Sequence, residues 1–289
     1  MTGKFLFRLF VLGLCCFAWP AWAQSRKELL PSPVSLPLPV RCSASVEFGY
    51  QEGLVMQVNK VDSDKFTRKG ASMGTECFFN FWQRRAPWFQ IMLEARFNTG
   101  EIIMKHHTSS VDALVSGTVY GGTFRGGLMA TTKYVDITLF AGAEITPEGR
   151  LEILDLELPL GDFTKFGKDH FVVMGSLKII EAGLKSRLKF WRKGHFTGLS
   201  LTTDFVWQMY IIEARTTPDA LSKRLLDAFK VDTSSLMVNS ATAQTYQIAL
   251  GLEYCYKSAC VYAAVPFGVY NPDNWGAGVR LGARILFQP

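Results

Sequence analysis

The chain has 289 residues, a formal net charge of +6 and 48% hydrophobic residues. Its Lys and Arg residues form no dense basic block, which excludes a nucleic-acid-binding surface of the usual kind. A mild positive charge says little about other partners.

Residues 1–23 have the three parts of a secretory signal peptide. Lys4 and Arg8 carry positive charge, an apolar run extends from Leu9 to Ala18, and Ala21-Trp22-Ala23 is a small-x-small cleavage site. The apolar run is shorter than the about 20 residues that span a bilayer. We therefore expect cleavage after Ala23 and export from a bacterial cytoplasm. An uncleaved anchor and a lipoprotein signal are the alternatives.

Residues 24–41 are predicted to form a Pro-rich N-terminal tail. Four prolines between Pro31 and Pro39 favour an extended polyproline conformation and exclude a central strand. Residues 42–289 show short alternating runs broken by turn residues, which predicts one β-domain.

Four cysteines remain after the signal peptide is removed: Cys42, Cys77, Cys255 and Cys260. An even number in an oxidising compartment suggests two disulfides. A tight turn at Lys257-Ser258 would place Cys255 opposite Cys260 on paired strands, which leaves Cys42 to pair with Cys77. Four free buried thiols are the alternative. Cys-x4-Cys without a nearby His is a poor zinc pattern, so we predict neither a metal nor a cofactor.

The last strand-like run, 275–287, has odd positions that are all apolar and even positions that are Gly or Arg up to Leu286. A tilted strand of this length spans roughly 30 Å, enough to cross the apolar band of a membrane. The runs 246–254 and 261–270 alternate in the same way, and their apolar faces coincide if Cys255 faces Cys260. Pro266 implies a bulge or a gap in pairing. A soluble β-sandwich is the alternative, but its strands are usually shorter.

The segment 280–287 resembles the C-terminal assembly signal of bacterial outer-membrane β-barrel proteins. Arg280, Gly282, Ile285 and Phe287 fill its four defined positions, although Gln288-Pro289 follow the terminal aromatic residue. The resemblance implies insertion by the barrel-assembly machinery into the outer membrane of a Gram-negative bacterium. There the chain would contact membrane lipid and lipopolysaccharide.

These patterns predict an all-β, antiparallel transmembrane β-barrel of 12–14 strands. One short helix is expected in an extracellular loop at 217–243. Thr217 would cap this helix, with Pro218 at its first position, Asp219 in its first turn and an apolar face of Leu221, Leu225, Leu226 and Phe229.

Eight charges would face the lumen: Lys185, Arg187, Lys189, Arg280, Arg284, Asp136, Glu144 and Glu253. A lumen of mixed charge fits a narrow channel, or a structural or adhesive barrel closed by ion pairs. Two alternatives remain: an outer-membrane lipid-modifying hydrolase, and a periplasmic lipid-binding β-groove. A hydrolase would need a His base, for which the chain offers His106, His107, His170 and His195. Each of these is more typical of a loop or interface histidine, so no catalytic residue is predicted.

Overall fold

The computed structural model describes residues 40–59, 62–81, 88–107, 112–158, 161–193, 197–220, 222–224, 241–271 and 274–287. The predicted signal peptide and residues 24–39 of the predicted tail lie outside these ranges. The described chain forms ten long antiparallel strands: β1 (Val40–Asn59), β2 (Asp62–Phe79), β3 (Phe89–His107), β4 (Asp112–Thr131), β5 (Val135–Leu158), β7 (Phe171–Lys193), β8 (Thr197–Pro218), β9 (Ala241–Tyr256), β10 (Ala259–Asn271) and β11 (Asn274–Phe287). A two-residue strand, β6 (Gly161–Asp162), and a short helix, α3 (Thr164–His170), lie between β5 and β7.

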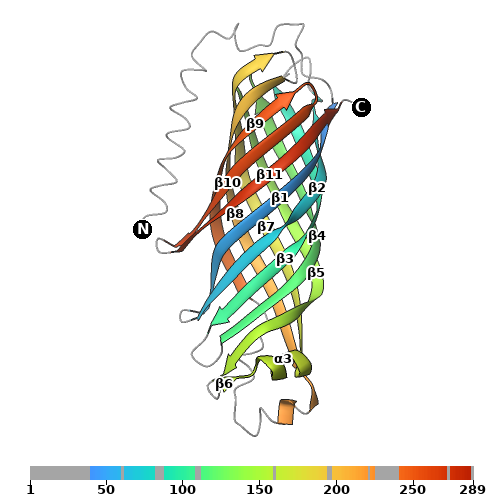
Figure 1. Ribbon diagram of the computed structural model, residues 1–289. Helices are drawn as coiled ribbons and strands as arrows, with labels where there is room; N and C mark the ends of the chain where they lie inside the picture. Colours follow the sequence, from blue (N-terminus) through green and yellow to red (C-terminus); the bar gives the residue numbers. More distant parts are fainter. Residues whose placement is uncertain are drawn as a thin grey trace.

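The strands close into a barrel, because the first strand pairs with the last. β1 is hydrogen-bonded to β2 on one side and to β11 on the other, and β4 pairs with β5 to complete the wall (Figure 1). Closure leaves neither edge of the sheet unpaired, which a membrane requires. The all-β barrel expected from the sequence is confirmed.

Large apolar side chains cover the outer face of the barrel. Phe48, Val261 and Ile285 are each about 60% exposed, and they alternate with inward-facing polar residues. Soluble proteins rarely expose so much apolar surface. This outer face is therefore the one that contacts lipid.

The expected number of 12–14 strands is wrong, because the real strands are longer than a membrane crossing requires. β5, β7 and β8 have 24, 23 and 22 residues, whereas a tilted membrane strand needs about 9–11. The sequence count divided this length among too many strands. Alternation is weak in two segments. The first, 151–160, is mainly the C-terminal part of β5, and the second, 205–212, lies within β8.

The C-terminal hairpins have the expected register. Cys255 pairs with Cys260 and Tyr254 with Val261, around a turn in which Lys257 has a φ of 53°. Disulfides join Cys255 to Cys260 and Cys42 to Cys77. Pro266 pairs with β9, but no pair with β11 occurs between Ala264 and Phe267. The missing pairs agree with the absence of an N–H group on proline.

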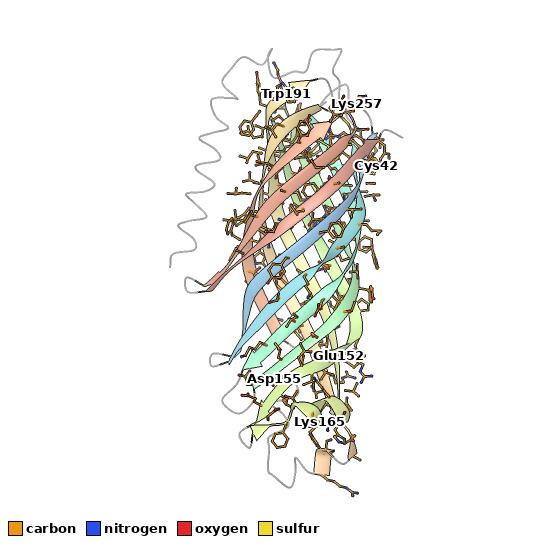
Figure 2. The ribbon with its side chains drawn as sticks, in the orientation of Figure 1. Cys42, Glu152, Asp155, Lys165, Trp191 and Lys257 are labelled. Atoms are coloured by element: carbon orange, nitrogen blue, oxygen red, sulfur yellow. A yellow bond between two sulfur atoms is a disulfide. The ribbon has the colours of Figure 1, made fainter. Side chains whose placement is uncertain are left out.

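The two ends of the barrel differ. β2, β4, β7, β9 and β11 finish at one end of the barrel, which we call the turn end and where the connections 132–134 and 257–258 lie. β6, α3 and Asp219 lie at the other, which we call the loop end (Figure 1). Figure 2 labels Lys257 and Trp191 at the turn end, and Asp155 and Lys165 at the loop end.

The expected helix after β8 starts later than predicted. β8 continues through Pro218, so Thr217 is a strand residue and not a cap. Asp219 is the cap instead, since its Oδ1 accepts hydrogen bonds from the backbone N–H and the hydroxyl of Ser222 (2.7 and 2.6 Å). Ala220 and residues 222–224 are helical; Leu221, Leu225, Leu226 and Phe229 lie outside the described residues.

The helix α3 was not predicted from the sequence. Asp162 accepts a hydrogen bond from the backbone N–H of Thr164, which begins the helix, but Gly167 weakens any helical pattern. None of the described helices is long and apolar enough to cross a bilayer.

Candidate functional site

The lumen is crossed by ion pairs that connect strands which are not neighbours in the wall. Lys185 on β7 contacts Glu94 on β3 (3.3 Å) and Glu76 on β2 (3.9 Å). Arg68 on β2 contacts Glu144 on β5. Side chains that reach from one side of a barrel to the other occupy the space that a channel would need.

All eight charged residues named from the sequence point into this interior and take part in ion pairs. Besides the contacts of Lys185 and Glu144, Arg284 pairs with Glu253 (2.6 Å) and Lys189 with Asp136 (2.6 Å). Arg187 bridges Glu253 and Asp136, at 3.3 and 3.9 Å. Arg280 has a weaker contact, with Asp204 at 3.6 Å.

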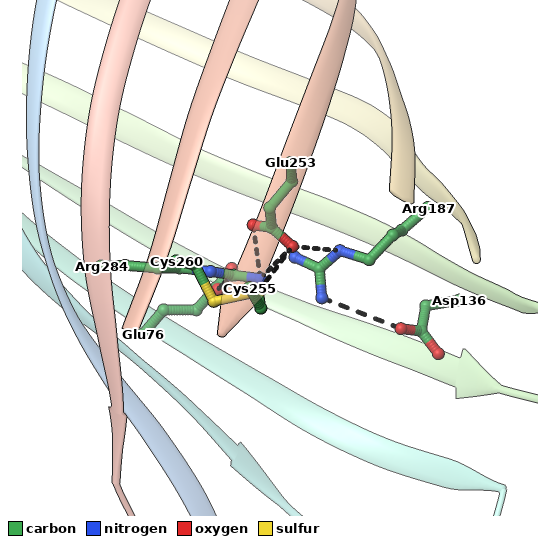
Figure 3. The surroundings of a disulfide bond; sticks show 7 residues. All are labelled: Glu76, Asp136, Arg187, Glu253, Cys255, Cys260 and Arg284. Atoms are coloured by element: carbon green, nitrogen blue, oxygen red, sulfur yellow. Dashed lines mark hydrogen bonds and ion pairs between the residues drawn. A yellow bond between two sulfur atoms is a disulfide. The ribbon is translucent and has the colours of Figure 1, made fainter. Parts of the chain in front are cut away.

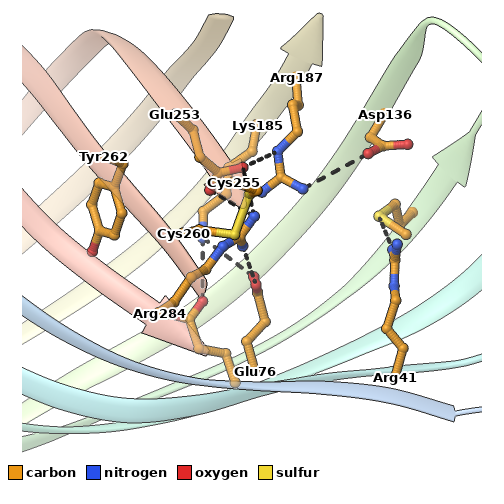
Figure 4. A network of polar contacts seen from close by, with 12 residues as sticks. Arg41, Glu76, Asp136, Lys185, Arg187, Glu253, Cys255, Cys260, Tyr262 and Arg284 are labelled. Atoms are coloured by element: carbon orange, nitrogen blue, oxygen red, sulfur yellow. Dashed lines mark hydrogen bonds and ion pairs between the residues drawn. A yellow bond between two sulfur atoms is a disulfide. The ribbon is translucent and has the colours of Figure 1, made fainter. Parts of the chain in front are cut away.

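The charges at the turn end form one connected network beside a disulfide. Figure 3 shows Glu253 between Arg284 and Arg187, next to Cys255–Cys260. Figure 4 shows the same network continuing through Lys185 and Glu76. Glu253 and the two cysteines lie close enough together to suggest a metal site. The disulfide removes both thiolates, so the group has no metal-binding sulfur in this state.

Glu94 is the centre of the lumen network, and sequence analysis missed it. Its side chain has no exposed surface and contacts Arg96, Arg125 (3.2 Å) and Lys185 (3.3 Å). Arg125 also forms a two-pronged contact with Glu181 on β7. The sequence did contain a signal, because polar and apolar residues alternate from Leu93 to Asn98. Nothing in the alternation shows which charges meet across the lumen.

The interior changes from polar to apolar towards the loop end. A first apolar cluster consists of the buried lumen-facing residues Ile102, Val119, Leu177, Ile179, Tyr210 and Ile212. A second apolar cluster lies farther out and consists of Leu151, Ile153, Leu156, Phe171 and Val173. Phe163 and Phe166, the latter on α3, pack against the second cluster. The described part of the loop end therefore has an apolar core against which α3 packs.

The described polar part of the lumen contains cavities between its side chains. Three cavities have volumes of about 80, 130 and 150 Å³. Each is well above the about 10–15 Å³ that a single water needs.

A histidine and a carboxylate meet at the loop end. His170 Nδ1 lies 2.8 Å from Asp219 Oδ2, and the backbone N–H of Asp219 donates to the His170 carbonyl (3.0 Å). Hydrogen bonds from Ser222 and His170 lower the pKa of Asp219 below its ordinary value. These contacts join the end of α3 to the segment after β8.

This arrangement does not match a serine hydrolase. The Ser222 hydroxyl donates to Asp219 and not to His170, so the carboxylate stands between the hydroxyl and the imidazole. A nucleophilic Ser needs the imidazole as its direct partner. The side chains of His106, His107 and His195 lie outside the described part of the structure.

Replacing Asp219 with alanine should loosen the junction at the loop end. The N–H of Ser222 loses its acceptor, so its hydrogen exchange should become several-fold faster, whereas asparagine should retain most of the protection because it also caps helices. The lowered pKa means that the carboxylate stabilises the fold above its unfolded-state pKa, and that this contribution disappears only as the pH falls through the lower folded value. Exchange at neutral pH, measured by mass spectrometry, checks both variants. Equal exchange in the wild type and the alanine variant would contradict the capping role.

The fold is that of known bacterial outer-membrane barrels. The outer membrane protease OmpT from Escherichia coli superposes with a TM-score of 0.53 at 10% identity, over 89% of this chain and all of OmpT. The translocator domain of the autotransporter NalP from Neisseria meningitidis gives 0.43 at 9% identity, over 86% and 88% of the two chains. The toluene transporter TbuX from Ralstonia pickettii gives 0.37 at 7% identity, over 87% and 90%.

No family model matches the chain, and no curated protein matches its sequence. The likeness to OmpT is one of fold, and it agrees with the outer-membrane location expected from the last strand.

Proposed function

We propose that the chain is a non-conducting outer-membrane barrel of the structural or adhesive kind, in which the lumen stabilises the fold and the loop end is presented outside the cell. The ion pairs that cross the lumen, above all those of Glu94, carry this proposal. A channel needs a continuous wet path, whereas here the charges neutralise one another and the two apolar clusters fill the loop end.

Other features support the structural role over the alternatives. The closed wall does not agree with a periplasmic β-groove, because the barrel has no open face. The order Ser222–Asp219–His170 does not support a serine hydrolase at this position. The extension of β5, β7 and β8 at the loop end forms a folded platform, as a surface-presented role requires.

The direction of insertion follows from the last strand. The C-terminal end of an assembly-signal strand faces the periplasm, which puts the turn end inside and the loop end outside. Short turns inside and long loops outside are also usual for these barrels. In this orientation α3 and the segment around Asp219 are extracellular.

Thiol labelling of whole cells tests this orientation. A cysteine introduced as Lys165→Cys, on α3, should react with a membrane-impermeant reagent, because Lys165 is exposed at the loop end. Lys133→Cys is the matched control: it replaces an exposed lysine at the turn end and should react only after the outer membrane is opened. The reverse result would invert the barrel and remove the basis for extracellular presentation. Ser234 belongs to the predicted extracellular loop 217–243 and would be another site for an introduced cysteine, but it lies outside the described residues.

A further inference from the structure

A polar cavity in the lumen has more positive than negative charge in its wall. The cavity of about 150 Å³ is lined by four arginines (Arg68, Arg96, Arg125 and Arg280) and by two carboxylates, Glu47 and Glu144. Amide side chains also line it, among them Asn98, Gln208 and Gln247. Carboxylates are too few to neutralise this wall from within the cavity.

Arg280 differs from the other three arginines in its pairing. Arg68 contacts Glu144, Arg96 contacts Glu47 and Glu94, and Arg125 contacts Glu94 and Glu181. Among the described residues, Arg280 forms an ion pair with Asp204, whose Oδ2 lies 3.6 Å from Nη2, too far for a hydrogen bond.

The unpaired atoms of Arg280 are buried. Its Nε and Nη2 atoms have almost no accessible surface and donate no hydrogen bond to any described residue. A buried N–H group without an acceptor is unfavourable, and more so when it is charged. Neither atom is open to the cavity as the side chain lies, but the side chain as a whole is 26% exposed and lines the cavity, so an oxyanion there would contact its exposed part.

We propose that this cavity binds a small oxyanion, a phosphate or carboxylate group, with Arg280 as its principal ligand. A guanidinium presents N–H donors in a planar fork that matches the oxygens of such groups. Gln247 and Gln208 line both this cavity and the neighbouring one of about 130 Å³, where Arg280 also lies, so their amides could supply further donors. The site goes beyond the structural role proposed above, since a closed lumen does not by itself require a ligand.

The anion could be dissolved, or it could be the headgroup of a membrane lipid. Both carry the same oxyanion chemistry, and the cavity recognises that chemistry rather than the rest of the molecule. The cavity lies on the loop-end side of the lumen network, where Tyr50 and Pro266 also line it. The test therefore includes one probe from each source.

A variant that changes charge but not shape tests the site. Gln247→Glu adds a carboxylate to the cavity wall on β9, outside the segment of the assembly signal, whereas a change of Arg280 could fail at assembly. Gln90→Glu is the matched control: it makes the same change on a buried lumen residue that does not line this cavity and that already accepts a hydrogen bond from Arg41.

The measurement is the thermal unfolding midpoint of the folded full chain in a zwitterionic detergent. Inorganic phosphate is titrated at constant ionic strength against chloride, and phosphatidic acid is added to the micelles in a second series. We expect a saturable rise in the wild-type midpoint, at least tenfold weaker apparent binding in Gln247→Glu, and wild-type binding in Gln90→Glu. Stabilisation by phosphate assigns a dissolved ligand, and stabilisation by phosphatidic acid alone assigns a lipid headgroup.

Two results would overturn the proposal. One is a wild-type barrel that neither probe stabilises beyond chloride, which would mean that the cavity binds no oxyanion. The other is a Gln247→Glu variant that folds and binds phosphate or phosphatidic acid as tightly as the wild type.

Discussion

Replacing Glu94 with glutamine should destabilise the barrel by about 3–5 kcal/mol, the usual cost of removing one partner from a buried ion pair. Glu94 contacts three cations, Arg96, Arg125 and Lys185, and its side chain is fully buried. The amide retains the shape but not the charge. The three cations would then face one another in the lumen with too little negative charge between them. Urea unfolding in detergent micelles, followed by the heat-modifiable gel shift, measures the loss.

Glu101→Gln on the same strand is the control for this effect. Glu101 pairs with Lys69 at 2.7 Å, but both side chains are more than a third exposed. An exposed pair of this kind contributes at most about 1 kcal/mol. If both variants lost the same small amount, the lumen network would not be the main stabilising feature of the barrel interior.

Gly282→Asp should prevent the barrel from folding. A Cβ atom at this position would lie 2.3 Å from Cζ of Tyr262, whose ring covers the glycine and whose hydroxyl donates to Glu47 (2.6 Å). The larger side chain would displace the ring and also bury another carboxylate. Gly49→Ala, on the neighbouring strand, should fold normally because the nearest atom to its Cβ would be at 3.6 Å. The folded fraction on an unboiled gel checks both variants, and a folded Gly282→Asp barrel would contradict the packing argument.

Phe287→Ala separates folding from assembly. Phe287 lies on the outer face, 43% exposed, so its loss should leave refolding in detergent unchanged. If it is the aromatic end of an assembly signal, the same variant should fail to accumulate in the outer membrane of cells. Wild-type levels of folded protein in cells would count against the signal.

The C-terminal hairpins could be predicted because the membrane imposes a regular alternation on them. From Tyr246 onwards, one face of each strand must contact lipid and the other must face the polar lumen. The alternation of residue types therefore predicts how the strands pair. The same reasoning failed for Phe205–Ile212. In that part of β8 the lumen-facing residues Val206, Tyr210 and Ile212 are also packed against apolar neighbours. Two apolar faces give no alternation, and the strand count was wrong as a result.

The candidate site could be predicted only in part from the sequence. The sequence shows that Lys185 and Arg284 belong to strands with an apolar outer face, and the structure places both in the lumen. Their partners come from β3, β9 and β2, far away in the sequence, so pairing depends on strand order and tilt. The two nitrogens of Arg280 that lack a hydrogen bond can be identified only when those partners are known.

Planar-bilayer recording of the folded wild-type protein tests the closed lumen most directly. On the function proposed above, the ion pairs across the lumen and the two apolar clusters at the loop end block the passage of ions. Insertion should therefore produce no stepwise current, while a general porin in the same bilayer gives its usual steps. Reproducible ohmic steps from the wild-type barrel would contradict the account and establish a channel.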